Sequence, residues 1–331
     1  MGLLSARVMD WVWYQPNPVQ WILWPLGWIY RAAVFIRRSL YRLGLRPVTE
    51  LAVPVIVVGN ISVGGTGKTP CVIWLAGELQ SRGFRVGVIS RGYGGNAADW
   101  PQRVEPDSDP SLVGDEPVLL SAMIGCPVVV GPDRVAAAER LLGEAEVDVL
   151  LSDDGLQHYA LARSMEVCVV DGERGLGNGL CLPAGPLREP VSRMREVDAI
   201  VVNGGSWGHA GVFRATAVPQ RVYQVAGTAQ KPLAAFRDTQ VHAVAGIGNP
   251  QRFFDLLENA DVDVIPHPLP DHAQLTRTDL EFGDDRPVLV TGKDAVKCRA
   301  FAGENVWSVA IKLEFGRDEG ERLMRRVIRE L

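Results

Sequence analysis

A short apolar segment leads into a glycine-rich loop in Val55-Ile-Val-Val-Gly-Asn-Ile-Ser-Val-Gly-Gly-Thr-Gly-Lys-Thr-Pro70. β-Branched residues favour a strand before the loop, and the apolar spacing from Cys71 to Gln80 favours a helix after it. In a strand–loop–helix unit of this kind, backbone N–H groups and the positive end of the helix dipole face a polyphosphate. The stretch therefore predicts a nucleoside triphosphate site.

The loop supplies most of the residues that we expect to bind the nucleotide. Lys68 would reach the outer phosphates, and the hydroxyl of Thr69 would hold Mg²⁺. The strict motif has glycine where this chain has Ser62, so a plain glycine-rich turn before a helix is the alternative. The intact core favours the nucleotide site, and its residues are Gly64, Gly65, Thr66, Gly67, Lys68 and Thr69.

Composition limits the class of protein. The chain has 331 residues, of which 47% are apolar, so it can form two domains or one large α/β domain with a full core. Its net charge of −5 argues against nucleic-acid binding, which requires a basic surface. The five cysteines are scattered without C-x-x-C spacing, and we expect reduced thiols, not disulfides or a zinc site.

The N-terminal segment departs from the acidic average. Within residues 1–46 the only acidic residue is Asp10. The same segment contains several arginines and more than half of the nine tryptophans in the chain. Trp and Tyr prefer the headgroup region of a membrane, and arginines pair with lipid phosphates. Gln20, Pro25 and Arg31 interrupt the segment too early for a spanning helix, which needs about 20 apolar residues. An apolar stripe at helical spacing consists of Leu26, Ile29, Ala33, Ile36, Leu40 and Leu43.

We therefore expect an amphipathic helix that lies in a membrane surface. The alternative is an amphipathic helix packed on the core of the protein itself, because apolar stripes most often serve that purpose. A cleavable signal peptide is not indicated, since the early charged region and the small-residue cleavage site are missing.

Strand patterns alternate with helical patterns from Val53 to about Asn203, and near-continuous Val/Ile runs indicate a parallel sheet covered on both faces. Two short strands, Val212–Val218 and Arg221–Val225, are expected to connect this sheet to a second α/β unit that ends in a helix over Asp318–Leu331. The expected division is 1–45 for the N-terminal segment, 46–205 for the nucleotide-binding domain, 206–228 for a two-stranded linker and 229–331 for the second domain.

Two acidic pairs stand beside apolar elements. Asp153 and Asp154 end an apolar strand, where P-loop enzymes hold Mg²⁺, although adjacent aspartates also form turns. Asp115 and Glu116 precede an apolar helical run. Asp115 could cap that helix, or it could be the base that accepts a proton from an attacking hydroxyl group.

Three other loops present polar side chains. Arg188, in a proline-rich loop, would neutralise charge on a transferring phosphoryl group, or it is an ordinary surface arginine. Arg91 and Tyr93 follow the second strand, at the sheet edge where ligands bind, although glycine-rich turns alone would explain the spacing. His272 follows Asp271 after prolines, and a catalytic role would need partners from the other domain that the sequence does not reveal.

Several strings occur in one order along nearly the whole chain: Asn60–Pro70, Ser90–Gly95, Gly114–Pro117, Ser152–His158, Leu182–Pro190, Pro270–His272 and Thr291–Lys297. Together they resemble the tetraacyldisaccharide 4'-kinase family of lipid A biosynthesis. The resemblance implies a P-loop NTPase-like parallel sheet domain, a smaller α/β/α domain, a two-stranded linker and an N-terminal membrane-associated helix.

The resemblance also implies an activity. The expected enzyme uses ATP and Mg²⁺ to phosphorylate the 4'-hydroxyl of tetraacyldisaccharide 1-phosphate, which forms lipid IVA. Its expected place is the cytoplasmic face of the bacterial inner membrane, as a peripheral or monotopic protein whose partners are the lipid substrate and the membrane surface. Nucleic acid is not an expected partner.

The family motifs assign roles to particular residues. Asp115 matches the catalytic base, His272 matches its partner, and Arg188 is placed with the catalytic residues. Many relatives have a second histidine where this chain has Ala273. Gln157 matches the nucleotide shell and Arg91 and Tyr93 match substrate-side positions, while the metal shell consists of Thr69, Glu116, Asp153 and Asp154.

A membrane-associated P-loop ATPase that acts as a partner switch is the competing hypothesis. Such proteins commonly carry a lysine where this chain has Val63, and the string Gly114–Pro117 also argues against that class. ATP consumption that depends on an acceptor would separate the two hypotheses.

Overall fold

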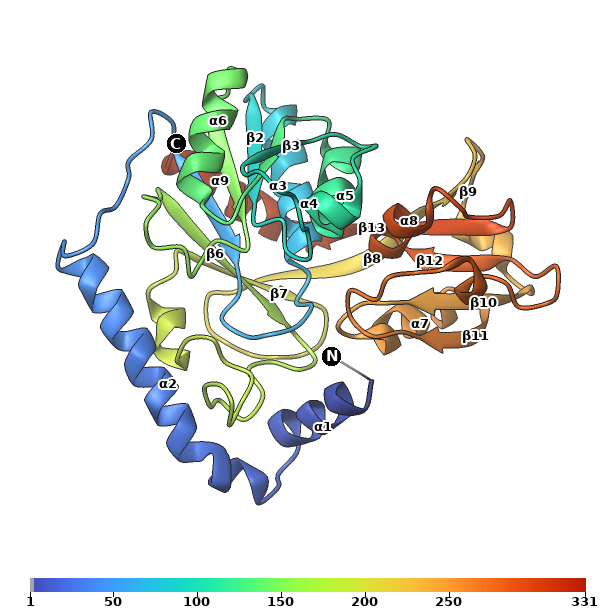
Figure 1. The fold of residues 1–331 in the computed structure, drawn as a ribbon, viewed down its shortest axis with the longest axis horizontal. Helices are drawn as coiled ribbons and strands as arrows, with labels where there is room; N and C mark the ends of the chain where they lie inside the picture. The colour runs from blue at the N-terminus through green and yellow to red at the C-terminus, as the bar shows by residue number, and fades with distance from the viewer. Residues whose placement is uncertain (1–2) are drawn as a thin grey trace.

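The computed structural model describes residues 3–331. A larger and a smaller unit lie side by side, and two long strands, β8 (Phe213–Gln224) and β13 (Val306–Phe315), run between them (Figure 1). Through these strands the two units share one continuous hydrogen-bonded sheet. The expected α/β architecture is confirmed.

The larger unit is built on a mostly parallel sheet. Its central strands are short runs of Val, Ile and Leu that are buried along their length, as expected for a sheet with both faces covered. The antiparallel edge strand β3 is too short to leave a sequence pattern. In pairing order the strands are β7 (Ala199–Asn203), β6 (Met165–Asp171), β1 (Val55–Gly59), β5 (Val149–Asp153), β2 (Val86–Ser90), β4 (Val128–Val130) and β3 (Gln102–Val104).

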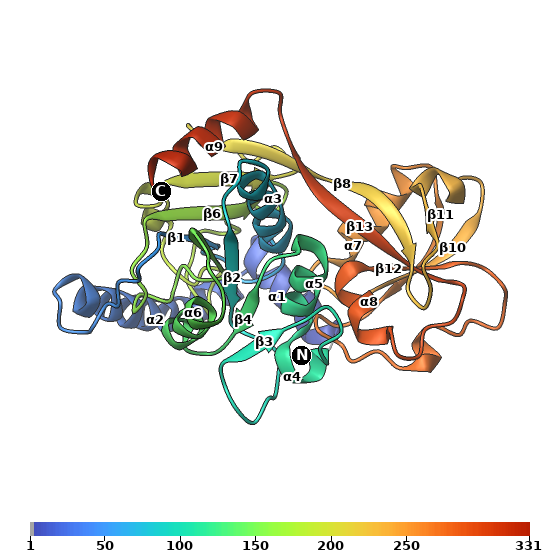
Figure 2. The same ribbon diagram turned by 90° about the horizontal axis from the view of Figure 1, so that it is seen from above.

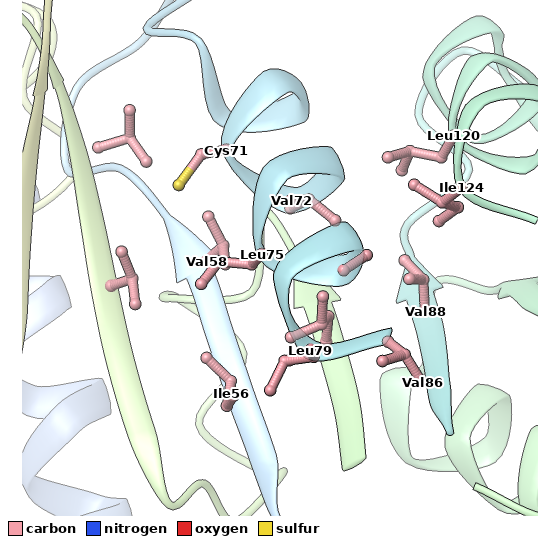
Figure 3. Close-up of a cluster of buried hydrophobic side chains, with 14 of the residues drawn as sticks. Ile56, Val58, Cys71, Val72, Leu75, Leu79, Val86, Val88, Leu120 and Ile124 are labelled. Carbon is pink, nitrogen blue, oxygen red and sulfur yellow. The ribbon is translucent and has the colours of Figure 1, made fainter. Parts of the chain in front are cut away.

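Helices cover both faces of this sheet. Ile56 and Val58 of β1 lie in one core cluster with α3 and, beyond it, α5 on one face (Figure 3), and Val55 and Val57 lie in a cluster with α6 on the other. This division follows from the alternation of side chains along a strand. The helices of the unit are α3 (Lys68–Ser81), α4 (Pro110–Val113), α5 (Asp115–Ile124) and α6 (Arg134–Glu144), with a 3₁₀ turn η1 (Val191–Arg195).

The smaller unit repeats the α/β arrangement. Its parallel strands pair in the order β11, β10, β12 and β13, and α7 buries Phe253, Phe254 and Leu257 against them. Its elements are β9 (Gln230–Lys231), β10 (Gln240–Ala245), β11 (Asp263–Pro268), β12 (Val288–Thr291), α7 (Pro250–Glu258), α8 (Gly292–Cys298) and the 3₁₀ turns η2 (Leu233–Phe236) and η3 (Arg277–Asp279).

The connection between the units corrects one expectation. The two short strands expected at Val212–Val218 and Arg221–Val225 form one strand, β8, and its antiparallel partner is β13. Pro219 does not end β8, because the pairing shifts register there, between Ala310 and Ile311, and a bulge tolerates a residue without an N–H group. The two linker strands therefore come from distant parts of the sequence.

The C-terminal helix, α9 (Glu319–Arg329), packs on the larger unit, whereas the sequence places this helix with the smaller one. Its buried side chains Leu323, Met324 and Val327 join the core cluster that contains α3 and β1. α9 reaches the larger unit because β13 is long and carries the chain back across the linker before α9 begins (Figure 2).

Two N-terminal helices, α1 (Leu3–Tyr14) and α2 (Val19–Arg42), lie outside the larger unit (Figure 1). Within residues 3–331, α2 alone is long and apolar enough to cross a membrane, judged by length and composition. One face of α2 docks through Gly27 and Tyr30, while Trp21 and Ile22 are each 75% exposed. In the predicted apolar stripe only Leu40 is half-buried, and the exposed members are Leu26, Ile29, Ala33, Ile36 and Leu43.

Candidate active site

The predicted phosphate loop lies between β1 and α3, at the carboxyl edge of the sheet. Gly64 and Gly67 have φ angles of 103° and 91°, which glycine adopts without strain. A Cβ atom at Gly67 would lie 2.0 Å from the Nδ2 atom of Asn203, so a side chain here would displace the amide that donates to the Thr66 carbonyl oxygen. Gly67 caps α3 without a side-chain bond, so the first N–H groups of the helix are available for an anion.

Amide side chains support this loop from behind. The Nδ2 atom of Asn60 donates to the Oγ1 atom of Thr66 at 3.1 Å, and the Nδ2 atom of Asn203 donates to the Thr66 carbonyl oxygen at 3.2 Å. The Nε2 atom of Gln157 donates to the Asn60 carbonyl oxygen at 3.0 Å. Gln157 thus lies behind the loop, and the sequence assigns no role to Asn60 or Asn203.

Asp153 ends β5 and is completely buried. The Oγ atom of Ser90 donates to its Oδ2 atom at 3.3 Å, whereas its Oδ1 atom has no hydrogen-bond partner among the described residues. Burial raises the pKa of Asp153 to about 7, and the negative charges of Glu116 and Asp154 add to this effect. A cation or a proton at this carboxylate would therefore be strongly favoured.

Asp154 lies where three basic side chains meet. Arg188 donates to its two carboxylate oxygens at 3.2 and 3.1 Å, and the Nζ atom of Lys68 is 3.7 Å from Oδ1. Burial would raise the pKa of Asp154, but Lys68 and Arg188 outweigh it and lower that pKa to about 2. The backbone of Asp154 is left-handed, with φ of 49°, and Arg134 donates to its carbonyl oxygen at 3.3 Å.

The structure brings Asp115 and His272 together from different units. Asp115 begins α5, where its Oδ1 atom accepts the Glu116 N–H group at 2.9 Å, while its Oδ2 atom lies 3.1 Å from the Nδ1 atom of His272. The hydrogen bond to Asp115 raises the pKa of His272 against the opposing effect of burial. Burial would raise the pKa of Asp115, but His272 and Lys293 lower it well below its usual range.

Two lysines of α8 also face the acidic pair. The ammonium group of Lys293 pairs with Glu116, and the Nζ atom of Lys297 lies 3.4 Å from the Oδ2 atom of Asp115. Burial would raise the pKa of Glu116, but Lys293 and then Lys68 lower it. Arg134 and both lysines are absent from the sequence-based site, although the lysines lie within the string Thr291–Lys297 that the resemblance includes.

Tyr93 and Arg91 lie at the open side of this cluster. The ring centroid of Tyr93 is 5.0 Å from that of His272, and the tyrosine is 58% exposed. Arg91 is also exposed, and its positive charge adds to the effect of burial in lowering the pKa of Arg134. The structure thus brings Tyr93 to the Asp115–His272 pair and Arg91 near Arg134.

The expected metal shell consists of oxygen donors. Thr69 is buried at the start of α3, near the sheet edge that also carries Asp153 and Asp154. No three His, Cys, Asp or Glu side chains in the described part of the chain converge on a common metal position. Mg²⁺ usually takes one or two carboxylates and completes its shell with water and phosphate oxygens, so a protein-only cage is not required.

Comparisons with known proteins cover nearly the whole chain. A family model described as Tetraacyldisaccharide-1-P 4'-kinase matches residues 19–329. The chain is 52% identical over 312 residues to the tetraacyldisaccharide 4'-kinase of Nitrosococcus oceani, covering 94% of this chain and 92% of the relative. It is 49% identical over 331 residues to that of Methylobacillus flagellatus, covering 99% and 98%.

A solved structure is also similar in fold to this chain, over most of the length of both. LpxK from Aquifex aeolicus, described as an "apo" form in complex with ATP, superposes with a TM-score of 0.80 at 28% sequence identity. The match covers 94% of this chain and 99% of that one.

Proposed function

The chain belongs to the tetraacyldisaccharide 4'-kinase family, and from this premise we propose that it transfers the γ-phosphate of ATP to the 4'-hydroxyl of tetraacyldisaccharide 1-phosphate. The product would be lipid IVA, an intermediate of lipid A biosynthesis. The observation that carries the proposal is the Asp115–His272 pair, which lies in the same site as the phosphate-loop residue Lys68. The family match gives no support to the alternative of a partner-switch ATPase.

Lys68 and Arg188 are proposed to bind the outer phosphates of ATP. Both cations already converge on one negative charge, the carboxylate of Asp154, so phosphate oxygens at this position would meet the same two groups. Arg188 can present two parallel N–H donors, which suits a phosphoryl group, whereas Lys68 acts as a compact charge. Together they would neutralise charge that develops during transfer.

Mg²⁺ is proposed to bind at Thr69, Glu116, Asp153 and Asp154, and these residues fit it. Their donors are hydroxyl and carboxylate oxygens, and the buried Oδ1 atom of Asp153 lacks a partner within residues 3–331. The raised pKa of Asp153 reflects its burial and then the negative charges of Glu116 and Asp154, and a divalent cation would relieve this concentration of charge. When bound, the ion would supply neutralisation of the phosphate charges.

Asp115 and His272 are proposed to remove the proton of the acceptor. The 4'-oxygen would form a bond to the γ-phosphorus, the bond to the bridging oxygen of ADP would break, and the hydroxyl proton would pass to the pair. Asp115 is held ionised, and His272 beside it can share the added proton, so the two act as one base. Tyr93 and Arg91, on the open side, would face the sugar.

The exposed face of α2 is proposed to lie in the cytoplasmic surface of the inner membrane. Trp21, Ile22 and Ile29 are at least two-thirds exposed, and aromatic and apolar side chains of this kind enter the headgroup region. The opposite face is tied to the body as far as Arg42, which pairs with Glu196 at 2.6 Å. A helix held flat in this way favours a monotopic arrangement, with the acyl chains of the acceptor remaining in the bilayer.

The dependence of ATP consumption on the acceptor tests this function. We expect the purified chain in detergent to release ADP only when tetraacyldisaccharide 1-phosphate is present. Lipid IVA is the matched control, because its 4' position already carries phosphate and it should not support ADP release. Equal ADP release without any acceptor would contradict the proposal and favour an ATPase.

A further inference from the structure

Arg188 lies on a loop, Leu182–Pro190, that is joined to the chain leading into the phosphate loop. The Arg188 N–H group donates to the carbonyl oxygen of Ile61 at 2.7 Å, and the Val63 N–H group donates to that of Pro186 at 2.9 Å. The inner side of the loop is therefore fixed to the segment that begins the nucleotide site, and the Arg188 side chain reaches Asp154 from there.

The outer side of the same loop is held by the N-terminal helices. The Nε1 atom of Trp13, in α1, donates to the carbonyl oxygen of Pro183 at 3.0 Å. The hydroxyl group of Tyr30, in α2, donates to the carbonyl oxygen of Arg188 itself at 3.2 Å. The helices α1 and α2, which lie outside the α/β core, thus contact the backbone of the loop from which the Arg188 side chain enters the site.

The close approach of α2 to the Arg188 loop depends on Gly27. This glycine is the buried residue of α2, and a Cβ atom there would lie 3.1 Å from the Cys181 carbonyl oxygen and 3.3 Å from the Cβ atom of Ala184. A side chain at this position would press against backbone, which cannot rotate away, so the loop or the helix would have to shift.

The same helix contacts a second part of the site. A guanidinium N–H group of Arg37 donates to the carbonyl oxygen of Gln157 at 3.3 Å, and the Gln157 side chain supports Asn60 behind the phosphate loop. The docked face of α2 therefore touches the backbones of two residues, Arg188 and Gln157, that come from separate loops.

We propose that α2 is a positioning element for the nucleotide site, in which Gly27 and Tyr30 fix the Arg188 loop and thereby set the affinity for ATP without any membrane. This inference rests on the proposed function, because it assumes that Arg188 binds the phosphates. It gives the two faces of one helix separate tasks: the exposed face binds lipid, and the docked face orders the site.

The experiment uses the full-length chain in detergent without acceptor. The Kd of Mg²⁺ with a non-hydrolysable ATP analogue is measured by calorimetry for wild type, Tyr30→Phe and Gly27→Leu. Tyr30→Phe removes one hydrogen bond to the loop and should weaken nucleotide binding about fivefold. Gly27→Leu places a side chain between α2 and the loop and should weaken nucleotide binding at least as much. Ala32→Leu adds bulk to an exposed position of the same helix and should leave the Kd unchanged.

A combined variant separates positioning from general destabilisation. Tyr30→Phe should cause no further loss of affinity in an Arg188→Ala background, because the group that it positions is already absent. An unchanged Kd in Tyr30→Phe, or an equal loss in both backgrounds, would overturn the inference. If Gly27→Leu does not fold, Tyr30→Phe still decides the question. Failure of the wild type to bind nucleotide would instead contradict the proposed function.

Discussion

The Nδ1 atom of His272 lies 3.1 Å from the Oδ2 atom of Asp115, although the two residues belong to different units of the fold. The contact depends on the linker strands β8 and β13, because they fix how the units are placed. His272 is also held in the left-handed backbone region, with φ of 57°, which costs energy in a non-glycine residue and is common at functional sites.

Replacement of Asp115 by Asn should lower kcat far more than it changes the KM for ATP. A base acts mainly in the transition state, and its loss typically costs about 10²- to 10⁴-fold in rate. Steady-state kinetics with saturating lipid acceptor measure the effect. A loss of ATP affinity alone would leave Asp115 a structural role at the start of α5, where Gly114 is the N-cap residue and Asp115 accepts the Glu116 N–H group.

The double variant Asp115→Asn with His272→Gln should lose little more activity than the more damaging single variant. Residues that act as one unit give non-additive losses, and the hydrogen bond between these two side chains predicts that behaviour. Rate losses that multiply would show that the two residues act separately.

His272 should also make stability depend on pH. Its pKa is raised in the folded state, so its contribution is fully present below its unfolded pKa, near 6.5, and is lost as pH rises through the folded pKa. Asp115 stays ionised throughout this range because its pKa is lowered. Denaturant unfolding should therefore show a larger difference in the free energy of unfolding between wild type and His272→Gln at pH 5.5 than at pH 8.5. An equal difference at both pH values would argue against an ion pair between His272 and Asp115.

Lys68→Ala should abolish turnover in the same assay. Lys68 is the positive side chain of the glycine-rich loop, at the first position of α3, and Asp154 would lose one of the charges that balance it. Near-normal turnover in this variant would mean that the assignment of the phosphate loop is wrong.

Local sequence patterns predict the larger unit well. The near-continuous Val/Ile runs that predict a parallel sheet are buried strands in the structure, such as β1 and β7, since runs of this kind report burial directly. The glycines of the predicted phosphate loop also agree with the backbone, because Gly64 and Gly67 lie in the left-handed region. The same reasoning fails for α8, which has seven residues and is too short for a periodic pattern.

Contacts between distant segments could not be predicted in the same way. Residue patterns alone give His272 no partner, and only the family resemblance pairs it with Asp115. The structure shows the contact itself, which forms because β8 and β13 place the two units. Lys293 and Arg134 are single cations among many, and only folding shows that they reach Glu116 and the backbone of Asp154. Gln157 is expected to touch the nucleotide, and only the structure shows that the Nε2 atom of Gln157 donates to the Asn60 carbonyl oxygen.

Removal of Met1–Leu43 should release the chain from membranes and reduce activity on the acylated substrate. Loss of the exposed apolar face removes burial in the interface, and each nearby arginine contributes about 1 kcal/mol at an anionic surface. Vesicle co-sedimentation and vesicle-based kinetics measure both effects. Raised salt should weaken attachment only in part, because apolar burial persists when charge is screened.

Truncation also removes the docked face of α2, so a second variant is needed. Serine at Trp21, Ile29 and Ile36 changes only exposed side chains and should reduce vesicle binding while ATP affinity is retained. A truncated chain that still sediments with vesicles and still phosphorylates embedded substrate at the full rate would show that the N-terminal helices do not anchor the enzyme.

The most direct measurement follows labelled phosphate from ATP into lipid. The full-length chain in detergent is incubated with γ-³²P-ATP and tetraacyldisaccharide 1-phosphate, and the lipid product is isolated and the position of its new phosphate determined. We expect label in the lipid as a monoester on the 4'-oxygen, dependent on both Asp115 and Lys68. Label that appears only as inorganic phosphate, or on another position of the lipid, would contradict the proposed 4'-kinase activity.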